Sequence, residues 1–158
     1  MYFRLYNAFI MPILTYNAGT WGLTDVTLKS LDAFHRRQLR SLLGIKWPET
    51  ISNAALYRRC CSEPISDVIK RLRWQLFGHI LRLDEDTLAR MAMAKYFDGR
   101  NQTRWRGRPR TTLPTVLATD LRNAGQGNLQ TKNDLEQLLT LANNRCLWRE
   151  LCLCVFLA

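Results

Sequence analysis

The chain is poor in the residue types that build most catalytic and metal sites. It holds 13 Asp and Glu against 23 Lys and Arg, and it has two histidines, His35 and His79. The acids fall mostly where helix caps are expected, so their spacing suggests no nucleophile with a base and an orienting group. The five cysteines contain no Cys-x-x-Cys pair, and their odd number argues against a disulfide framework. We therefore expect no catalytic residue, no bound metal, no cofactor, and reduced thiols in an intracellular protein.

Strand patterns and long apolar runs are also missing. No segment alternates apolar and polar residues with β-branched enrichment, and the apolar tail from Leu151 to Leu157 is too short to span a bilayer. The run from Leu5 to Leu14 is interrupted by Asn7 and Pro12, so we do not interpret it as a signal peptide. Apolar residues recur at helical spacing almost throughout. The sequence therefore predicts an all-α fold without a membrane partner.

Capping residues mark the expected helices. The first expected helix runs from Tyr2 to about Thr15, and Pro12 kinks or ends it. The next three run from Thr24 or Asp25 to Gly44, from Ser52 through Cys60, and from near Pro64 to Leu83. The last three run from an Asp86 cap to Phe97, from Thr112 and Pro114 to Gly125, and from a Thr131–Asp134 capping box to the C-terminus.

Residues 98–112 show no helical periodicity, because glycines and a proline stand among arginines. We predict two small helical lobes joined by an arginine-rich extended linker. Residues 1–97 form a lobe with basic helices, 98–112 form the linker, and 113–158 form a C-terminal helical lobe.

The net charge of +10 comes from two stretches of the chain. Residues 35–82 hold ten basic and three acidic side chains, and residues 100–110 hold five arginines and no acid. Such charge favours a polyanionic partner, because each neutralised phosphate releases condensed counterions. We expect RNA or DNA, bound through its backbone. The alternative is a helical protein–protein interaction module that docks an acidic partner.

The linker carries the sharpest motif, Arg104-Trp105-Arg106-Gly107-Arg108-Pro109-Arg110. Its core resembles the Arg-Gly-Arg-Pro of an AT-hook, in which glycine allows close approach and flanking guanidinium groups reach phosphates or the minor groove. The same run also fits a nuclear-import signal or a solvated linker. Trp105 can stack on an unpaired base or pack against a helix.

The expected nucleic-acid contacts form two sets. The linker supplies Arg100, Arg104, Trp105, Arg106, Arg108 and Arg110. The helices supply Arg36, Arg37, Arg40, Arg58, Arg59, Lys70, Arg71 and Arg73. These side chains form one basic face if their helices pack side by side. The alternative is that they are only charged, solvated side chains on helix exteriors.

Several blocks, in order along nearly the whole chain, resemble the C-terminal region of non-LTR (LINE-like) retrotransposon reverse transcriptases. Residues 5–21 are similar to the family's thumb segment, with its Pro-Ile-Leu-x-Tyr turn at Pro12 to Tyr16 and a following Trp21. Residues 73–82 are similar to its Arg-x-x-Gly-His-x-x-Arg helix. Further matching blocks are Leu39 to Ile45, Arg106 to Thr112, Asp120-Leu121, and Arg145 with Trp148-Arg149.

The resemblance implies the nucleic-acid-binding thumb and post-polymerase portion of such a reverse transcriptase. This portion grips template, product or target DNA in the nucleus, beside palm and fingers that supply the chemistry. The family's Ala-Asp-Asp-type metal motif is absent, so this chain is not expected to be an enzyme. Two departures stand out: Leu113 occupies a position where the family usually has Trp, and no Cys/His knuckle occurs near the C-terminus.

Overall fold

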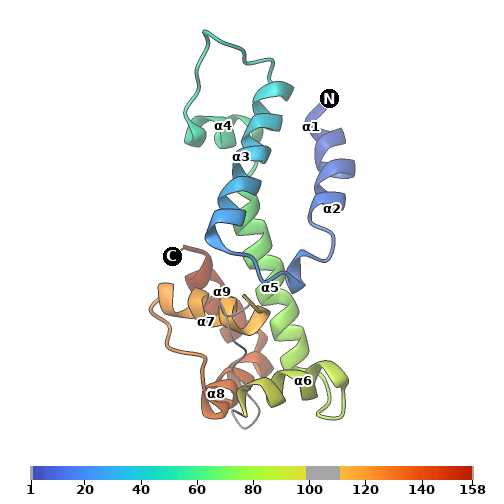
Figure 1. Cartoon of the computed structure of the whole chain (residues 1–158), viewed down its shortest axis with the longest axis vertical. Coiled ribbons are helices and arrows are strands. Elements are labelled where there is room, and N and C mark those ends of the chain that lie inside the picture. The colour runs from blue at the N-terminus through green and yellow to red at the C-terminus, as the bar shows by residue number, and fades with distance from the viewer. Residues whose placement is uncertain (1, 99–110, 158) are drawn as a thin grey trace, which may run out of the picture. The chain divides into compact units, whose positions relative to one another are not determined.

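The computed structural model describes residues 2–98 and 111–157. Within these ranges every regular element is helical and no strand occurs, which confirms the all-α prediction for the described residues (Figure 1). The elements are α1 (Tyr2–Leu5), the π-helical η1 (Tyr6–Ile10), α2 (Met11–Leu14), the 3₁₀ turn η2 (Ala18–Thr20), α3 (Asp25–Leu42), α4 (Asn53–Cys60), α5 (Ile65–Leu81), α6 (Leu88–Phe97), α7 (Leu113–Asn123), α8 (Lys132–Asn143) and α9 (Arg145–Leu157).

The N-terminal helix continues past Pro12 instead of ending there. The chain widens into the π turn η1, and the amide of Met11 donates to the carbonyl of Tyr6, five residues back. A proline ring normally clashes with the carbonyl four residues before it, and a wider turn relieves that clash. The helical run therefore reaches Leu14, one residue short of the expected end.

Most of the predicted helix starts are confirmed by cap geometry. The hydroxyls of Thr24 and Ser52 accept the amides three residues on, at 3.4 and 3.2 Å. Thr131 and Asp134 form the reciprocal capping box: the Thr131 hydroxyl accepts the Asp134 amide at 3.3 Å, and the Asp134 carboxylate accepts the Thr131 amide at 2.9 Å.

Two boundaries differ from the prediction. Thr87, not Asp86, is the N-cap of α6. The expected last helix is two helices, because Asn144 leaves the helical conformation, with φ −94° and ψ 104°. Its side-chain oxygen accepts the amides of Cys146 and Leu147 at 3.0 and 3.4 Å, so the residue that ends α8 also caps α9.

The chain folds as two compact units. Unit 1 comprises residues 1–18 and 24–70, and unit 2 comprises residues 19–23 and 71–158. This division differs from the predicted boundary at 98–112, because residues on both sides of that linker share one core: Met93 and Phe97 belong to the same buried cluster as Leu117 and Leu121. Continuous apolar packing, and not the basic composition of the linker, determines where the units divide.

Unit 1 has a small core with a polar centre. Tyr6, Leu39, Leu56 and Cys60 form its buried apolar cluster. Beside them, fully buried His35 lies 2.9 Å from the Tyr6 hydroxyl through Nδ1 and 3.1 Å from the Ser62 hydroxyl through Nε2. This network connects the N-terminal helix, α3 and the segment that precedes α5.

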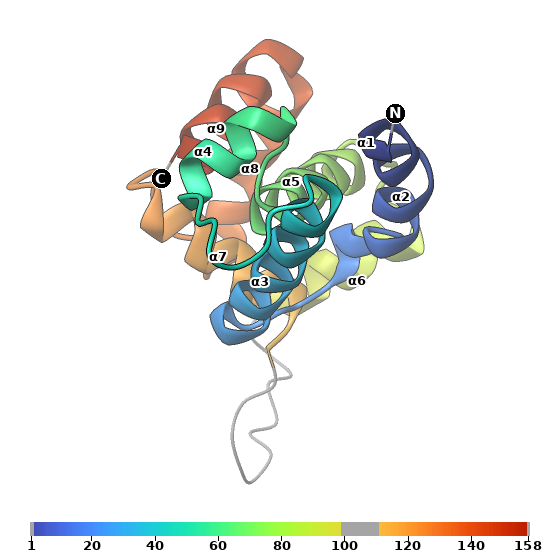
Figure 2. The same cartoon turned by 90° about the horizontal axis from the view of Figure 1, so that it is seen from above.

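Unit 2 has the larger core, in which α5 packs against α9. The ring centroids of Trp74 and Trp148 lie 5.7 Å apart, and those of Phe77 and Trp148 lie 6.0 Å apart. Gly78 makes this approach possible, because a Cβ built there would lie 2.6 Å from Cε2 of Trp148. α7, α8 and α9 lie together in both views, and α8 and α9 are in contact (Figure 2).

Candidate nucleic-acid interface

The structure separates the predicted contact residues into several groups. All six linker residues, Arg100, Arg104, Trp105, Arg106, Arg108 and Arg110, lie outside the described residues. The helix cations do not form one face of one unit. Arg36, Arg37, Arg40, Arg58, Arg59 and Lys70 belong to unit 1, whereas Arg71 and Arg73 belong to unit 2.

Arg73 is a correction to the predicted set. Its side chain has 0% exposure, and its Nη1 lies 2.8 Å from Oδ2 of Asp120, which is 8% exposed. Trp74 donates from its indole nitrogen to the same oxygen at 3.2 Å. A guanidinium held in this way inside the core is not accessible to a phosphate, so the structure places Arg73 in the core of unit 2 and not on a binding surface.

In unit 1 three cations gather where α3 ends. Arg37, Arg40 and Lys46 line a hollow of about 450 Å³, together with Ala33, Ser41, Gly44 and Ile45. Gly44 adopts a left-handed conformation with φ +70°, and the amide of Ile45 donates to the carbonyl of Arg40 at 3.0 Å. This is the Schellman pattern of bonds at a helix C-terminus, and it sets the direction in which the chain carries Lys46.

Arg40 also makes a local contact, and the remaining predicted cations of unit 1 lie outside this hollow. Arg40 donates from Nη2 to the side-chain oxygen of Asn53 at 2.7 Å, which ties α3 to the start of α4. Arg58 and Arg59 are exposed in the last turn of α4, where cations interact favourably with the helix dipole. Arg36 and Lys70 are half-buried.

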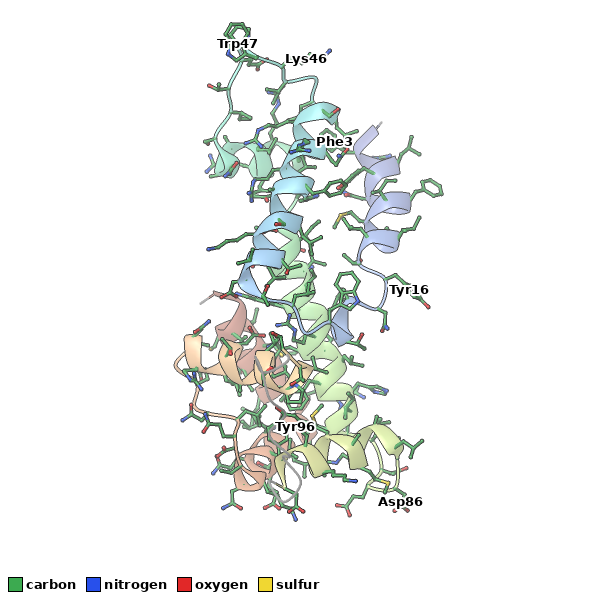
Figure 3. The ribbon with its side chains drawn as sticks, viewed as in Figure 1. Phe3, Tyr16, Lys46, Trp47, Asp86 and Tyr96 are labelled. Atoms are coloured by element: carbon green, nitrogen blue, oxygen red, sulfur yellow. The ribbon has the colours of Figure 1, made fainter. Side chains whose placement is uncertain are left out.

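Trp47 was missed by the sequence analysis. Its indole is 91% exposed and lies in the loop between α3 and α4, directly after Lys46 (Figure 3). A large aromatic side chain usually buries most of its surface, so this exposed indole, next to Lys46 in the sequence, is a candidate contact residue. The sequence signal was the pair Lys46-Trp47 itself, followed by a proline, outside any apolar stripe.

A second basic hollow lies in unit 2, between α5 and α9. The lining of this α5–α9 groove, of about 450 Å³, consists of Arg71, Gln75, Arg82, Arg145, Trp148, Arg149, Cys152 and Leu153. No carboxylate occurs among these described lining residues. Arg82 donates from Nη1 to the carbonyl of Ala142 at 3.2 Å, which holds its guanidinium in place.

Neither the groove nor three of its arginines was predicted as a contact site. The available signal was the spacing of Arg145 and Arg149, four residues apart and therefore on one face of a helix. Only the fold could add Arg71, in α5, and Arg82, in the turn after it, because both are far from α9 in the sequence.

The groove keeps its positive charge, because its one thiol is not ionised near neutral pH. Burial raises the pKa of Cys152 to about 11, although neighbouring Arg82 acts in the opposite direction.

Within residues 2–98 and 111–157, no three His, Cys, Asp or Glu side chains gather as a metal site would require.

Arg145 and Arg149 are placed at a cost to helix stability. Arg145 is the first residue of α9, whose first turn has no acid, so its charge is opposed by the positive end of the helix dipole. Like charges four residues apart also repel by about 0.2–0.5 kcal/mol.

The comparisons with known proteins give no further guide. No family model matches the chain, and no curated protein and no solved structure matches it. Within the described residues, no helix combines the length and apolar character that crossing a membrane requires.

Proposed function

We propose that this chain binds RNA or DNA through the phosphate backbone, as the C-terminal portion of a non-LTR retrotransposon reverse transcriptase. The observation that carries the proposal is the α5–α9 groove, whose described lining includes four arginines and no acidic residue. Guanidinium groups bind phosphate in a planar, bidentate way, and a groove of like charge concentrates polyanions.

The family assignment rests on the sequence blocks that resemble it. Several of these blocks come together inside unit 2: Gly78 accommodates Trp148, and Arg73 with Trp74 holds Asp120. These blocks are far apart in the sequence but contact one another in one core. The need to form that core is a reason for such blocks to occur together in one sequence.

In this proposal the chain holds nucleic acid in the nucleus, and the palm and fingers of the polymerase carry out synthesis. Primer extension on a primed template with magnesium or manganese is expected to give no incorporation above a control without protein. Template-dependent incorporation by this chain would overturn that part of the proposal.

Salt-dependent binding of the full chain tests the proposed function. Fluorescence anisotropy with labelled duplex DNA between about 50 and 200 mM salt should give an association constant that falls steeply with salt. Replacing Arg145 and Arg149 with Gln should lower the slope of log K against log salt by about 1.8, because each lost phosphate contact on duplex DNA contributes about 0.9.

A matched control removes the same charge from another part of unit 2. Lys95 and Lys132 are exposed and line no described hollow, so Lys95→Gln with Lys132→Gln should leave the slope nearly unchanged. Equal losses in both double variants would show that net charge, and not the groove, governs binding. Equal competition by polyglutamate would support the acidic protein partner instead.

A further inference from the structure

We propose that Trp47 and the cations of the α3 hollow, Arg37, Arg40 and Lys46, form a site for single-stranded nucleic acid. An unpaired base stacks on the indole, and the adjoining phosphates contact the three cations. This inference rests on the proposed function and adds to it the class of ligand and a second site, in unit 1.

The exposure of Trp47 is the first support. Its indole is 91% exposed, the highest fraction among the large exposed hydrophobic side chains of the described residues. Stacking on a base would cover a face of the ring and leave its edge in water, as in proteins that bind single strands without sequence preference.

The fixed path of the loop is the second support. The Schellman bonds at Gly44 and Ile45 set the exit from α3, and the amide of Glu49 donates to the carbonyl of Lys46 at 2.9 Å. This turn encloses Trp47, so the indole stands on a loop that is anchored on both sides. A pre-organised aromatic residue loses less entropy when it binds.

The charge beside the loop is the third support. Arg37, Arg40 and Lys46 line the hollow, and no carboxylate occurs among its described lining residues. Glu49 is the one acid between α3 and α4. An alternative explanation for these cations is that positive charge near a helix C-terminus stabilises the helix. That explanation does not account for an exposed indole in the next loop.

A single strand fits these features better than a duplex or a membrane. The base faces of a duplex are already stacked on each other, so they are not available to an indole. Insertion into a membrane interface needs several apolar side chains, but the neighbours of Trp47 in the loop include exposed Lys46, Pro48, Glu49 and Thr50.

The test compares normal and abasic strands on the full chain. Trp47→Ala should weaken binding of a short labelled oligothymidylate about 5- to 150-fold, which corresponds to the loss of one base–aromatic stack. It should leave unchanged the binding of an abasic strand of equal length and of duplex DNA. Trp47→Phe should restore part of the loss, because a phenyl ring still offers a stacking face.

Two further variants separate stacking from charge and from general exposure. Arg37→Gln with Lys46→Gln should lower the salt slope for the single strand by about 1.4, at about 0.7 for each lost contact, whereas Trp47→Ala should not change that slope. Tyr16→Ala removes another aromatic side chain of unit 1, one that is 80% exposed, and should have no effect (Figure 3).

The outcomes are distinguishable. If the unmodified chain binds no oligonucleotide, the proposed function itself fails. If it binds all three ligands and Trp47→Ala changes none of the constants, the stacking site is overturned while backbone binding stands. If Trp47→Ala abolishes binding to vesicles of phosphatidylserine and phosphatidylcholine in equal parts but not to oligothymidylate, the loop is a membrane contact and the inference is wrong.

Discussion

Removal of Asp120 should destabilise unit 2 far more than an ordinary substitution. The carboxylate pairs with fully buried Arg73 at 2.8 Å and accepts the Trp74 indole proton at 3.2 Å. Asp120→Ala would leave a guanidinium in the core without a counter-charge. Breaking a buried pair in this way costs about 3–5 kcal/mol, and the Trp74 donor also loses its acceptor.

Replacing both partners should cost much less than removing one. Nε and Nη2 of Arg73 are buried and have no hydrogen-bond partner among the described residues, so the pair is already incompletely satisfied. Arg73→Met with Asp120→Asn removes the charge and these donors, and it keeps an oxygen that accepts from Trp74. We expect this double variant to lie within about 1 kcal/mol of the unmodified chain, or above it.

Urea unfolding followed by circular dichroism and tryptophan fluorescence measures both effects. The control is Glu136→Ala, which removes an exposed carboxylate from the same unit and should change the free energy of unfolding by less than about 0.5 kcal/mol. The reasoning is refuted if Asp120→Ala costs no more than this control, or if the double variant is as unstable as Asp120→Ala.

Three further predictions concern pH, packing and the linker. Burial lowers the pKa of His35 below its ordinary value of 6.5, with Asp32 acting in the opposite direction, so the unfolded chain binds more protons. The contribution of His35 to stability should therefore be complete above about pH 6.5 and fall as the pH drops toward the folded-state pKa. Urea titrations across this range should lose that dependence in His35→Gln and keep it in the control His79→Gln. Gly78→Ala should destabilise the protein despite a gain in helix propensity of about 1 kcal/mol, because the new Cβ meets the Trp148 indole; thermal unfolding tests this, and Trp148→Leu should relieve the effect. Changing Arg104, Arg106, Arg108 and Arg110 to Ala should lower the salt slope on duplex DNA by about 3 to 4 if all four contact phosphates, with the circular dichroism spectrum unchanged; a wild-type slope would exclude the linker as a binding element.

Helix starts were predictable because caps are local. Thr24, Ser52 and Thr131 each accept a hydrogen bond from the amide three residues on. A few neighbouring residues therefore suffice to recognise each cap from the sequence. The break at Asn144 was missed because apolar residues continue at helical spacing on both sides of it. The signal was present in Asn143-Asn144, since asparagine is a favoured N-cap.

The burial of Arg73 was only partly readable from the sequence. Arg73 lies four residues after Ile69 and four before Phe77, both fully buried, so it stands on the apolar stripe of α5. The partner that makes this position tolerable, Asp120, lies 47 residues further on, and nothing local identifies it. The α5–α9 groove was missed for the same reason, since its arginines come from two segments that are distant in the sequence.

The composition of unit 2 has a consequence for the order in which it can form. Trp74 and Phe77 are made before the indole that packs against them, which belongs to Trp148. Gly22, made earlier still, packs against Thr111 and Thr112, since a Cβ there would lie 2.8 Å from the Thr111 carbonyl. A ribosome that has not yet released α9 therefore holds a chain whose largest apolar side chains are uncovered. Exposed apolar surface of this kind favours aggregation until α9 is available to cover it.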